Sequence, residues 1–187
     1  MRVSAFLLSL AATATVAASI TSCAGPSAPV QNAKTAPEET INLSAAGEFS
    51  KDDTAAIVYD RKLAPQGAQA SITVESSGGQ TRTSLVVEGL RPRRTYGAHL
   101  HAKPCGTDPE AAGPHYQHHP GQIDPVSEVW LDFTTNEEGQ GRSAARNDWA
   151  LERAKLPGSL VIHSKATKKS GPQVGTAGDR VACLTLK

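Results

Sequence analysis

Seven short runs rich in apolar and β-branched residues recur along the chain, and they restrict its fold more than any other feature. The runs are AAIVYD (55–60), ASITVE (70–75), TSLVVEGL (83–90), TYGAHLH (95–101), VWLDFTT (129–135), SLVIHS (159–164) and RVACLTL (180–186). Gly, Pro, Asn and Asp punctuate the segments between them, as in SSGGQ, NEEGQG and KLPGS, and no long amphipathic helix pattern appears. The pattern predicts an all-β domain, a Greek-key sandwich or barrel that carries its function on loops.

The N-terminus has the pattern of an export signal. One basic residue, Arg2, precedes an apolar run from about Ala5 to Ala18, and small residues follow up to Cys23. The run is too short, and its side chains are too small, for a stable membrane span. The ITSC segment ending at Cys23 resembles the lipobox of bacterial lipoproteins, whose cysteine carries lipid. We therefore expect residues 1–22 to be a signal peptide and the mature protein to be exported and anchored through Cys23 to the outer face of the cell membrane. A chance cysteine after an apolar helix is the alternative.

Composition divides the remaining chain into a tether and one domain. Residues 23–47 are rich in Ala, Pro, Ser and Thr and have little apolar surface to bury, which predicts a flexible linker. Residues 48–187 are enough for a single domain with one core. Removal of residues 1–22 takes away only Arg2, so 18 of the 19 basic residues remain against 18 acidic ones. This balance argues against nucleic acid as a partner, because nucleic-acid binders show a marked basic excess.

The histidines are concentrated in one part of the chain. All six lie between residues 99 and 163: His99, His101, His115, His118, His119 and His163. Side chains alternate along a strand, so His99 and His101 project together while Leu100 faces the core. The same alternation in SLVIHS places His163 on the face opposite Ile162. Imidazoles from two strands can therefore converge, and imidazole suits copper, zinc, iron and nickel better than magnesium or calcium.

Four motifs in order resemble the copper-zinc superoxide dismutase family, and the match covers most of residues 50–187. YGAHLHAKPC (96–105) is similar to the Gly-x-His-x-His strand of the family, with a nearby cysteine as in its bacterial branch. AAGPHY (111–116) is similar to the segment that carries the histidine shared between two metals. LVIHS (160–164) resembles the strand with the last copper ligand, and GTAGDRVAC (175–183) resembles the Gly-rich turn with the active-site arginine and the disulfide cysteine.

The resemblance implies a fold and a reaction. The fold is an eight-stranded antiparallel Greek-key β-barrel or sandwich with long functional loops, in a monomer or homodimer. The reaction is the copper-dependent dismutation of superoxide to oxygen and hydrogen peroxide. Transferred residue by residue, the copper ligands are His99, His101, His115 and His163. Arg180 guides the anionic substrate, and His115 also carries a proton.

The cysteine count agrees with export. If Cys23 carries lipid, only Cys105 and Cys183 remain, and disulfides persist in exported proteins. We expect these two cysteines to pair, as the resemblance also implies. The bond would fix the loop that follows the strand of His99 and His101.

The zinc side departs from the family pattern. Val126 and Val129 fall where a later histidine and an aspartate are expected, and valine cannot bind a metal. The candidates for a degenerate zinc site, or for contacts behind the copper ligands, are His118, His119, Asp124 and Glu128. For the two histidines, loop surface is a further option. Metal-bound histidines usually donate their second nitrogen to another group. Glu128, or else Asp124, is the predicted partner of His115. The sequence thus predicts a copper-only enzyme, with a two-metal site as the alternative.

The acidic residue that the family pattern places soon after the last copper ligand is also missing. HSKATKKS provides Lys165, Lys168 and Lys169 instead. These lysines either raise the association rate of an anionic substrate or belong to a merely solvated loop.

Two other functions fit the same residues. The first is a non-enzymatic copper-binding or copper-buffering envelope lipoprotein that uses the same four histidines. Arg180 speaks against it, because storage of a cation gains nothing from a neighbouring positive charge. The second is a structural envelope domain with incidental histidines, and the clustering of six histidines beside a matched cysteine pair speaks against that.

Overall fold

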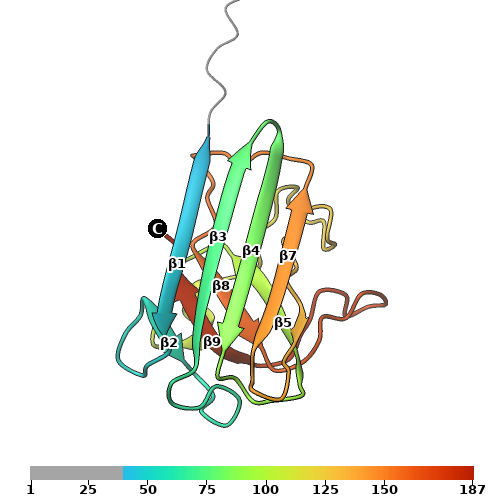
Figure 1. Cartoon of the computed structure of the whole chain (residues 1–187). Coiled ribbons are helices and arrows are strands. Elements are labelled where there is room, and N and C mark those ends of the chain that lie inside the picture. Colours follow the sequence, from blue (N-terminus) through green and yellow to red (C-terminus); the bar gives the residue numbers. More distant parts are fainter. Residues whose placement is uncertain (1–39) are drawn as a thin grey trace, which may run out of the picture. The chain divides into compact units, whose positions relative to one another are not determined.

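The computed structural model describes residues 40–187, in which nine strands and one short 3-10 helix follow one another (Figure 1). The strands are β1 (Ile41–Glu48), β2 (Ala56–Val58), β3 (Gln69–Ser77), β4 (Gln80–Glu88), β5 (Thr95–His101), β6 (Phe133–Thr134), β7 (Gly141–Asn147), β8 (Ser159–His163) and β9 (Arg180–Thr185), and the 3-10 helix is η1 (Pro109–Ala112). This part of the chain contains no helix of the length and apolar character that a membrane crossing needs. The predicted signal peptide, Cys23 and linker residues 23–39 lie outside the described residues.

The strands form two antiparallel sheets, ordered β1-β3-β4-β7 and β2-β9-β8-β5-β6. Figure 1 shows the first sheet in front of the second. Strands β4 and β7 are neighbours although β5 and β6 lie between them in sequence, which is a Greek-key connection. The all-β, antiparallel prediction is confirmed. The sheets are not closed by hydrogen bonds into a barrel, and the pairing of short β6 with the start of β5 brings the number of strands in the described residues to nine rather than eight.

The core lies between the sheets. In β3, Ala70, Ile72 and Val74 are buried while the residues between them are exposed, as expected for a sheet with one solvated face. The largest buried apolar side chains, from both sheets and the segments next to them, include Phe49, Ile72, Leu85, Leu90, Tyr96, Leu100, Leu131, Leu160, Ile162 and Leu184. Strands β5 and β8 are buried on both faces apart from the first residue of β5, so their outward side chains are also shielded from water.

Strand β1 corrects the predicted extent of the flexible linker. The composition predicts residues 41–47 as part of the tether, but β1 pairs with β3 from Ile41, opposite Ser76, to Glu48, opposite Gln69. The reason is an alternation in which Ile41 is buried and Leu43 and Ala45 pack against the core. The inward positions end in the small residues Ala45 and Gly47, which weakens this alternation in the sequence. The ordered domain therefore begins earlier than residue 48.

The disulfide between Cys105 and Cys183 is present, with 78 residues separating the two cysteines. Both side chains are buried in a small apolar cluster with Ile57, Ala112 and Val161. In the chain-entropy model, closing a loop of this length stabilises the fold by roughly 4 to 5 kcal/mol. The bond attaches the segment after β5 to β9, so it holds two elements that border the histidines.

Candidate metal centre

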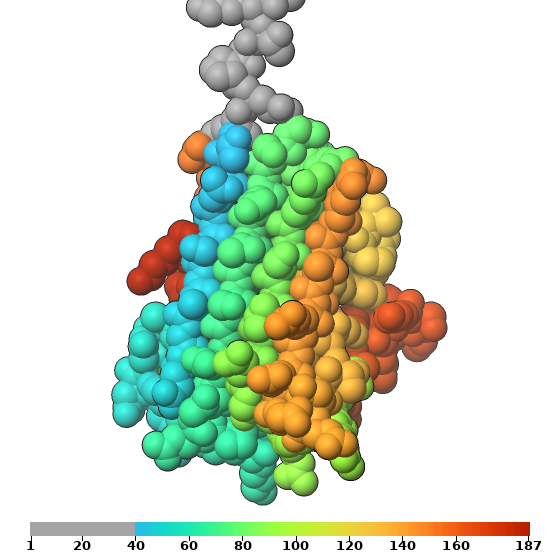
Figure 2. Space-filling view, in the orientation of Figure 1, coloured from blue at the N-terminus to red at the C-terminus, as the bar shows by residue number. Residues whose placement is uncertain are grey.

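Four histidines converge on the outer side of the second sheet. His99 and His101 project from β5, His163 ends β8, and His115 comes from the segment after η1. Strand pairing places Gly97 opposite His163, and a β-bridge joins His101 to His115, so backbone register brings the rings together. One possible ligand atom from each ring lies within 4.8 Å of the others. Figure 2 views the molecule from the side of the first sheet, so the surface facing the reader is formed by β1, β3, β4 and β7. The segments near residues 120 and 170 protrude beside β7.

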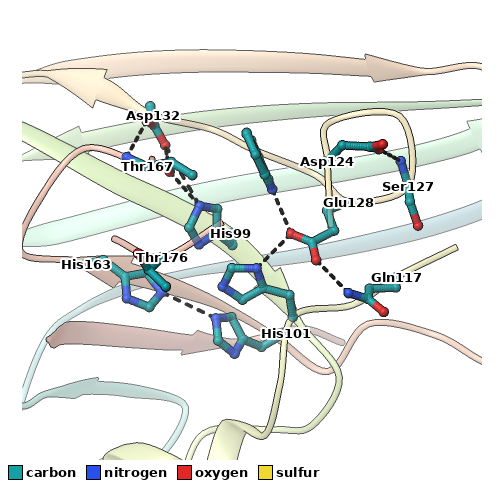
Figure 3. Close-up of polar contacts among 12 residues, drawn as sticks. His99, His101, Gln117, Asp124, Ser127, Glu128, Asp132, His163, Thr167 and Thr176 are labelled. Atoms are coloured by element: carbon teal, nitrogen blue, oxygen red, sulfur yellow. Dashed lines mark hydrogen bonds and ion pairs between the residues drawn. The ribbon is translucent and has the colours of Figure 1, made fainter. Parts of the chain in front are cut away.

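Two of these rings are fixed by backbone carbonyls. His101 Nδ1 lies 2.9 Å from the Gly113 oxygen, and His163 Nδ1 lies 3.1 Å from the Gly178 oxygen. A carbonyl oxygen only accepts, so each ring carries its proton on Nδ1 and keeps a lone pair on Nε2. The two Nε2 atoms face each other at 3.4 Å. Figure 3 marks this approach.

The His115 ring is fixed by a buried carboxylate. Its Nδ1 donates to Glu128 Oε2 at 2.8 Å, and the Glu128 side chain is only 1% exposed. Gln117 Nε2 and Trp130 Nε1 donate to the same carboxylate at 2.8 and 2.7 Å. Burial alone would raise the pKa of Glu128, but the hydrogen bonds from His115, Gln117 and Trp130 outweigh it and leave the pKa below its ordinary value. Glu128 is therefore an acceptor that leaves His115 Nε2 with its lone pair.

His99 is held through Nε2, whereas the other three rings are held through Nδ1. Its Nε2 lies 2.7 Å from Thr167 Oγ1, and its Nδ1 is buried with no hydrogen-bond partner among the described residues. A buried polar nitrogen without a partner costs free energy, so its presence calls for a ligand. The free Nδ1 completes a set of four ring nitrogens, the others being Nε2 of His101, His115 and His163.

Burial keeps three of the four imidazoles neutral. Desolvation, reinforced by the neighbouring His115, lowers the pKa of His101 to about 2. Desolvation also lowers the pKa of His163 to about 4 and that of His99 well below its ordinary value. Metals bind the neutral form of histidine, and a cluster of imidazole nitrogens suits copper. The residues present therefore fit a copper ion.

A cavity of about 530 Å³ opens beside the four histidines, and His115, His163 and Arg180 are among its lining residues. Arg180 Nη1 and Nη2 donate to the carbonyl oxygens of Pro109 and Gly113 at 2.6 and 2.8 Å. Its side chain is 12% exposed and forms an ion pair with Glu110 at 3.1 Å. The guanidinium is thus fixed at the cavity wall, where a small anion can reach it.

His118, His119 and Asp124 lie apart from this cluster. His118 stacks on Trp149 with ring centroids 4.7 Å apart, and its other ring neighbour is His119. Asp124 Oδ1 accepts the backbone N–H groups of Val126 and Ser127, so this carboxylate closes a turn. Among residues 40–187, the one group of metal-ligating side chains that the structure assembles contains none of His118, His119, Asp124 and Glu128.

The two valines at the expected zinc positions have ordinary surroundings. Val126 is 62% exposed, whereas Val129 is buried in the core. Neither position presents a metal-binding atom.

Sequence reasoning missed the residues that fix the rings from behind, namely Thr167, Asp132, Trp130 and Gln117. For Trp130 and Asp132, the alternation in VWLDF (129–133) was a usable signal. Because Val129, Leu131 and Phe133 are buried in the core, the intervening Trp130 and Asp132 face the same side as the histidines.

The chain is similar to known proteins in sequence and in fold. A family model described as copper/zinc superoxide dismutase matches residues 68–185. A solved structure of Cu/Zn superoxide dismutase from Brucella abortus is 18% identical, with a TM-score of 0.54, over 80% of this chain and all of that chain. The clock protein EA4 is 20% identical, with a TM-score of 0.51, over 80% of this chain and 94% of that chain. No curated protein sequence shows significant similarity.

Proposed function

The chain belongs to the copper/zinc superoxide dismutase family, and from this premise we propose that it catalyses the copper-dependent dismutation of superoxide to oxygen and hydrogen peroxide. The observation that supports the proposal most strongly is the set of four clustered imidazoles, three of them buried and each with one nitrogen free, beside a cavity with a fixed arginine. The ligands would be His99, His101, His115 and His163. Bound copper would supply a centre that is stable in two charge states.

The protein's own residues would handle the substrate and its protons. Arg180 lines the cavity, and its permanent charge attracts and orients a small anion. Two backbone carbonyls hold its guanidinium, so the orientation needs no rearrangement when the anion arrives. His115 also lines the cavity, and Glu128 holds its Nδ1. Its Nε2 is therefore the atom at which this ring would hold or release a proton.

The proposal is tested by two measurements on one sample. Metal content and superoxide consumption are measured on the purified protein at increasing copper loading. Consumption in proportion to bound copper supports the enzyme. Full copper loading without superoxide consumption would contradict the proposal and favour copper storage as the function. In a storage protein, the fixed arginine at the cavity would have no purpose.

Copper as the sole metal is part of the proposal. A second metal at His115 would need the lone pair of Nδ1, but this nitrogen donates its proton to Glu128. Structural zinc sites are normally closed by four protein ligands. The described residues near His115 assemble no such set. Glu128 would thus hold the ring that a second metal holds in a two-metal site.

Reloading experiments should show that zinc adds nothing. Metal-free protein is loaded with copper alone or with copper plus zinc, dialysed, and analysed for metal content and turnover. We expect equal turnover and no retained zinc, because Glu128 occupies the second nitrogen of His115. One tightly held zinc per chain would contradict the copper-only proposal and restore the two-metal alternative.

Export and membrane attachment are proposed from the sequence alone. The residues concerned, 1–22 and Cys23, lie outside the described part of the chain. Mass spectrometry of the mature N-terminus would detect a lipid on Cys23, and an unmodified Cys23 in the mature protein would contradict the anchor.

A further inference from the structure

A buried hydroxyl stands between His99 and a carboxylate. Thr167 Oγ1 lies 2.7 Å from His99 Nε2 and donates to Asp132 Oδ1, while the Thr167 backbone N–H donates to Asp132 Oδ2 at 2.9 Å. Figure 3 shows Thr167 between the two. His99 Nε2 and Asp132 Oδ1 are themselves 3.9 Å apart, too far for a hydrogen bond. The hydrogen-bonded connection between the carboxylate and the ring therefore runs through the hydroxyl.

The direction of these hydrogen bonds follows from the number of protons. A carboxylate only accepts, so the single hydroxyl proton of Thr167 is given to Asp132. The hydroxyl must then accept from His99, which places the ring proton on Nε2 and the lone pair on the buried, unpartnered Nδ1. His101 and His163 have the opposite arrangement, with the proton on Nδ1. The His99 ring thus presents a different nitrogen to the centre.

Burial strengthens the arrangement. His99 is 1% exposed and Thr167 is 5% exposed, so water cannot replace a lost bond. Gly97 allows Thr167 to approach, because a Cβ atom at this position would lie 3.0 Å from Thr167 Oγ1 and 2.8 Å from the Lys165 oxygen. The backbone N–H of Gly97 instead donates to that oxygen at 2.7 Å. Strand β5 therefore holds both the histidine and the segment that supports it.

We propose that Thr167 and Asp132 are positioning residues that set the tautomer of His99 and aim its Nδ1 at the metal. The carboxylate comes from the segment next to β6, and it acts at the end of the cluster opposite Glu128. The inference deepens the proposed function, on which it rests, by identifying what orients one of the four ligands.

The experiment compares copper affinity and the Cu(II) electron paramagnetic resonance spectrum in four variants. Thr167→Val removes the hydroxyl at constant shape, Thr167→Ser keeps it, and Asp132→Asn removes the charge. Thr134→Val is the matched control, because it removes an exposed hydroxyl that bonds to Thr95 and touches no histidine. Affinity is measured by competition with a chelator, and folding of the metal-free proteins by circular dichroism.

We expect Thr167→Val to lose roughly 10- to 100-fold in copper affinity, the usual cost of removing an outer partner of a ligating histidine. The electron paramagnetic resonance spectrum of Thr167→Val should differ from that of the wild type, and the spectrum of Asp132→Asn should differ in the same direction. Thr167→Ser and Thr134→Val should match the wild type in affinity and spectrum. If Thr167→Val fails to fold, Asp132→Asn provides the same comparison. Wild-type affinity and spectrum in Asp132→Asn, or in a folded Thr167→Val, would overturn the proposal.

The two proposals fail in different ways. If the wild-type protein binds copper without consuming superoxide, the proposed function is wrong, while the affinity and spectral differences among the variants still stand. If turnover is present and the variants bind copper like the wild type, only the role of Thr167 and Asp132 is wrong.

Discussion

Replacing His163 with alanine should abolish tight copper binding and remove nearly all dismutase activity. His163 provides one of four ring nitrogens, and its Nε2 lies 3.4 Å from that of His101. Removing an outer partner of a ligating histidine already costs roughly 10- to 100-fold in metal affinity, so removing the ligand itself should cost more. The measurement is copper content after dialysis together with superoxide consumption. His99→Ala, His101→Ala and His115→Ala should behave in the same way.

The matched control is His118→Ala. His118 lies close to His115 in sequence, but its ring stacks on Trp149 and stands outside the cluster. This variant should keep wild-type copper content and turnover. A His163→Ala protein with full copper occupancy and turnover would show that the site assignment is wrong.

The convergence of the histidines could be predicted because it depends on local rules. Alternation along β5 places His99 and His101 on the face opposite Ala98 and Leu100, and both apolar residues lie in the core as expected. The position of His115 follows from a resemblance rather than from periodicity, since its segment is irregular. What brings it to the site is a bridge to His101.

Two strands escaped prediction for a shared reason. Strand β1 and strand β7 consist largely of Ala, Ser, Gly and charged residues, so their apolar alternation is weak. Pairing with β3 and β4 compensates for this weak alternation, because these neighbouring strands supply the large apolar side chains. Tertiary context decides strand formation in such segments more than intrinsic propensity does.

The groups behind the four histidines were only partly predictable. Glu128 could be proposed because it is close to His115 in sequence and a carboxylate was needed there. Thr167 and Asp132 are 35 residues apart, and their contact depends on how the segment after β8 folds back over β5. The sequence lacks an acid soon after His163, and the carboxylate that stands behind Thr167 comes instead from the segment just before β6. Only the tertiary structure reveals such a replacement.

Replacing Arg180 with glutamate should slow superoxide consumption by tenfold or more, within the range of about 10- to 1,000-fold that electrostatic steering contributes. The guanidinium lies in the wall of the cavity beside His115 and His163, so reversing its charge would repel the anion at the last step of approach. The wild-type rate should fall as salt rises, because screening shortens the reach of charge. Stopped-flow rates over a range of ionic strength measure both effects.

Two further variants separate guidance from structural support. Arg180 Nη2 and His101 Nδ1 share the Gly113 oxygen, so copper content must be measured in every variant. Glu110→Gln removes the carboxylate that pairs with Arg180 without touching either bond, and it should raise the rate at low salt because Arg180 then acts with its full charge. Arg82→Glu makes the same charge reversal on an exposed position of the other sheet, and it should change the rate little. If Arg180→Glu keeps its copper and matches the wild type at low salt, Arg180 does not guide the anion. If it is slow while Glu110→Gln is fast, the charge at the cavity wall controls the rate of encounter.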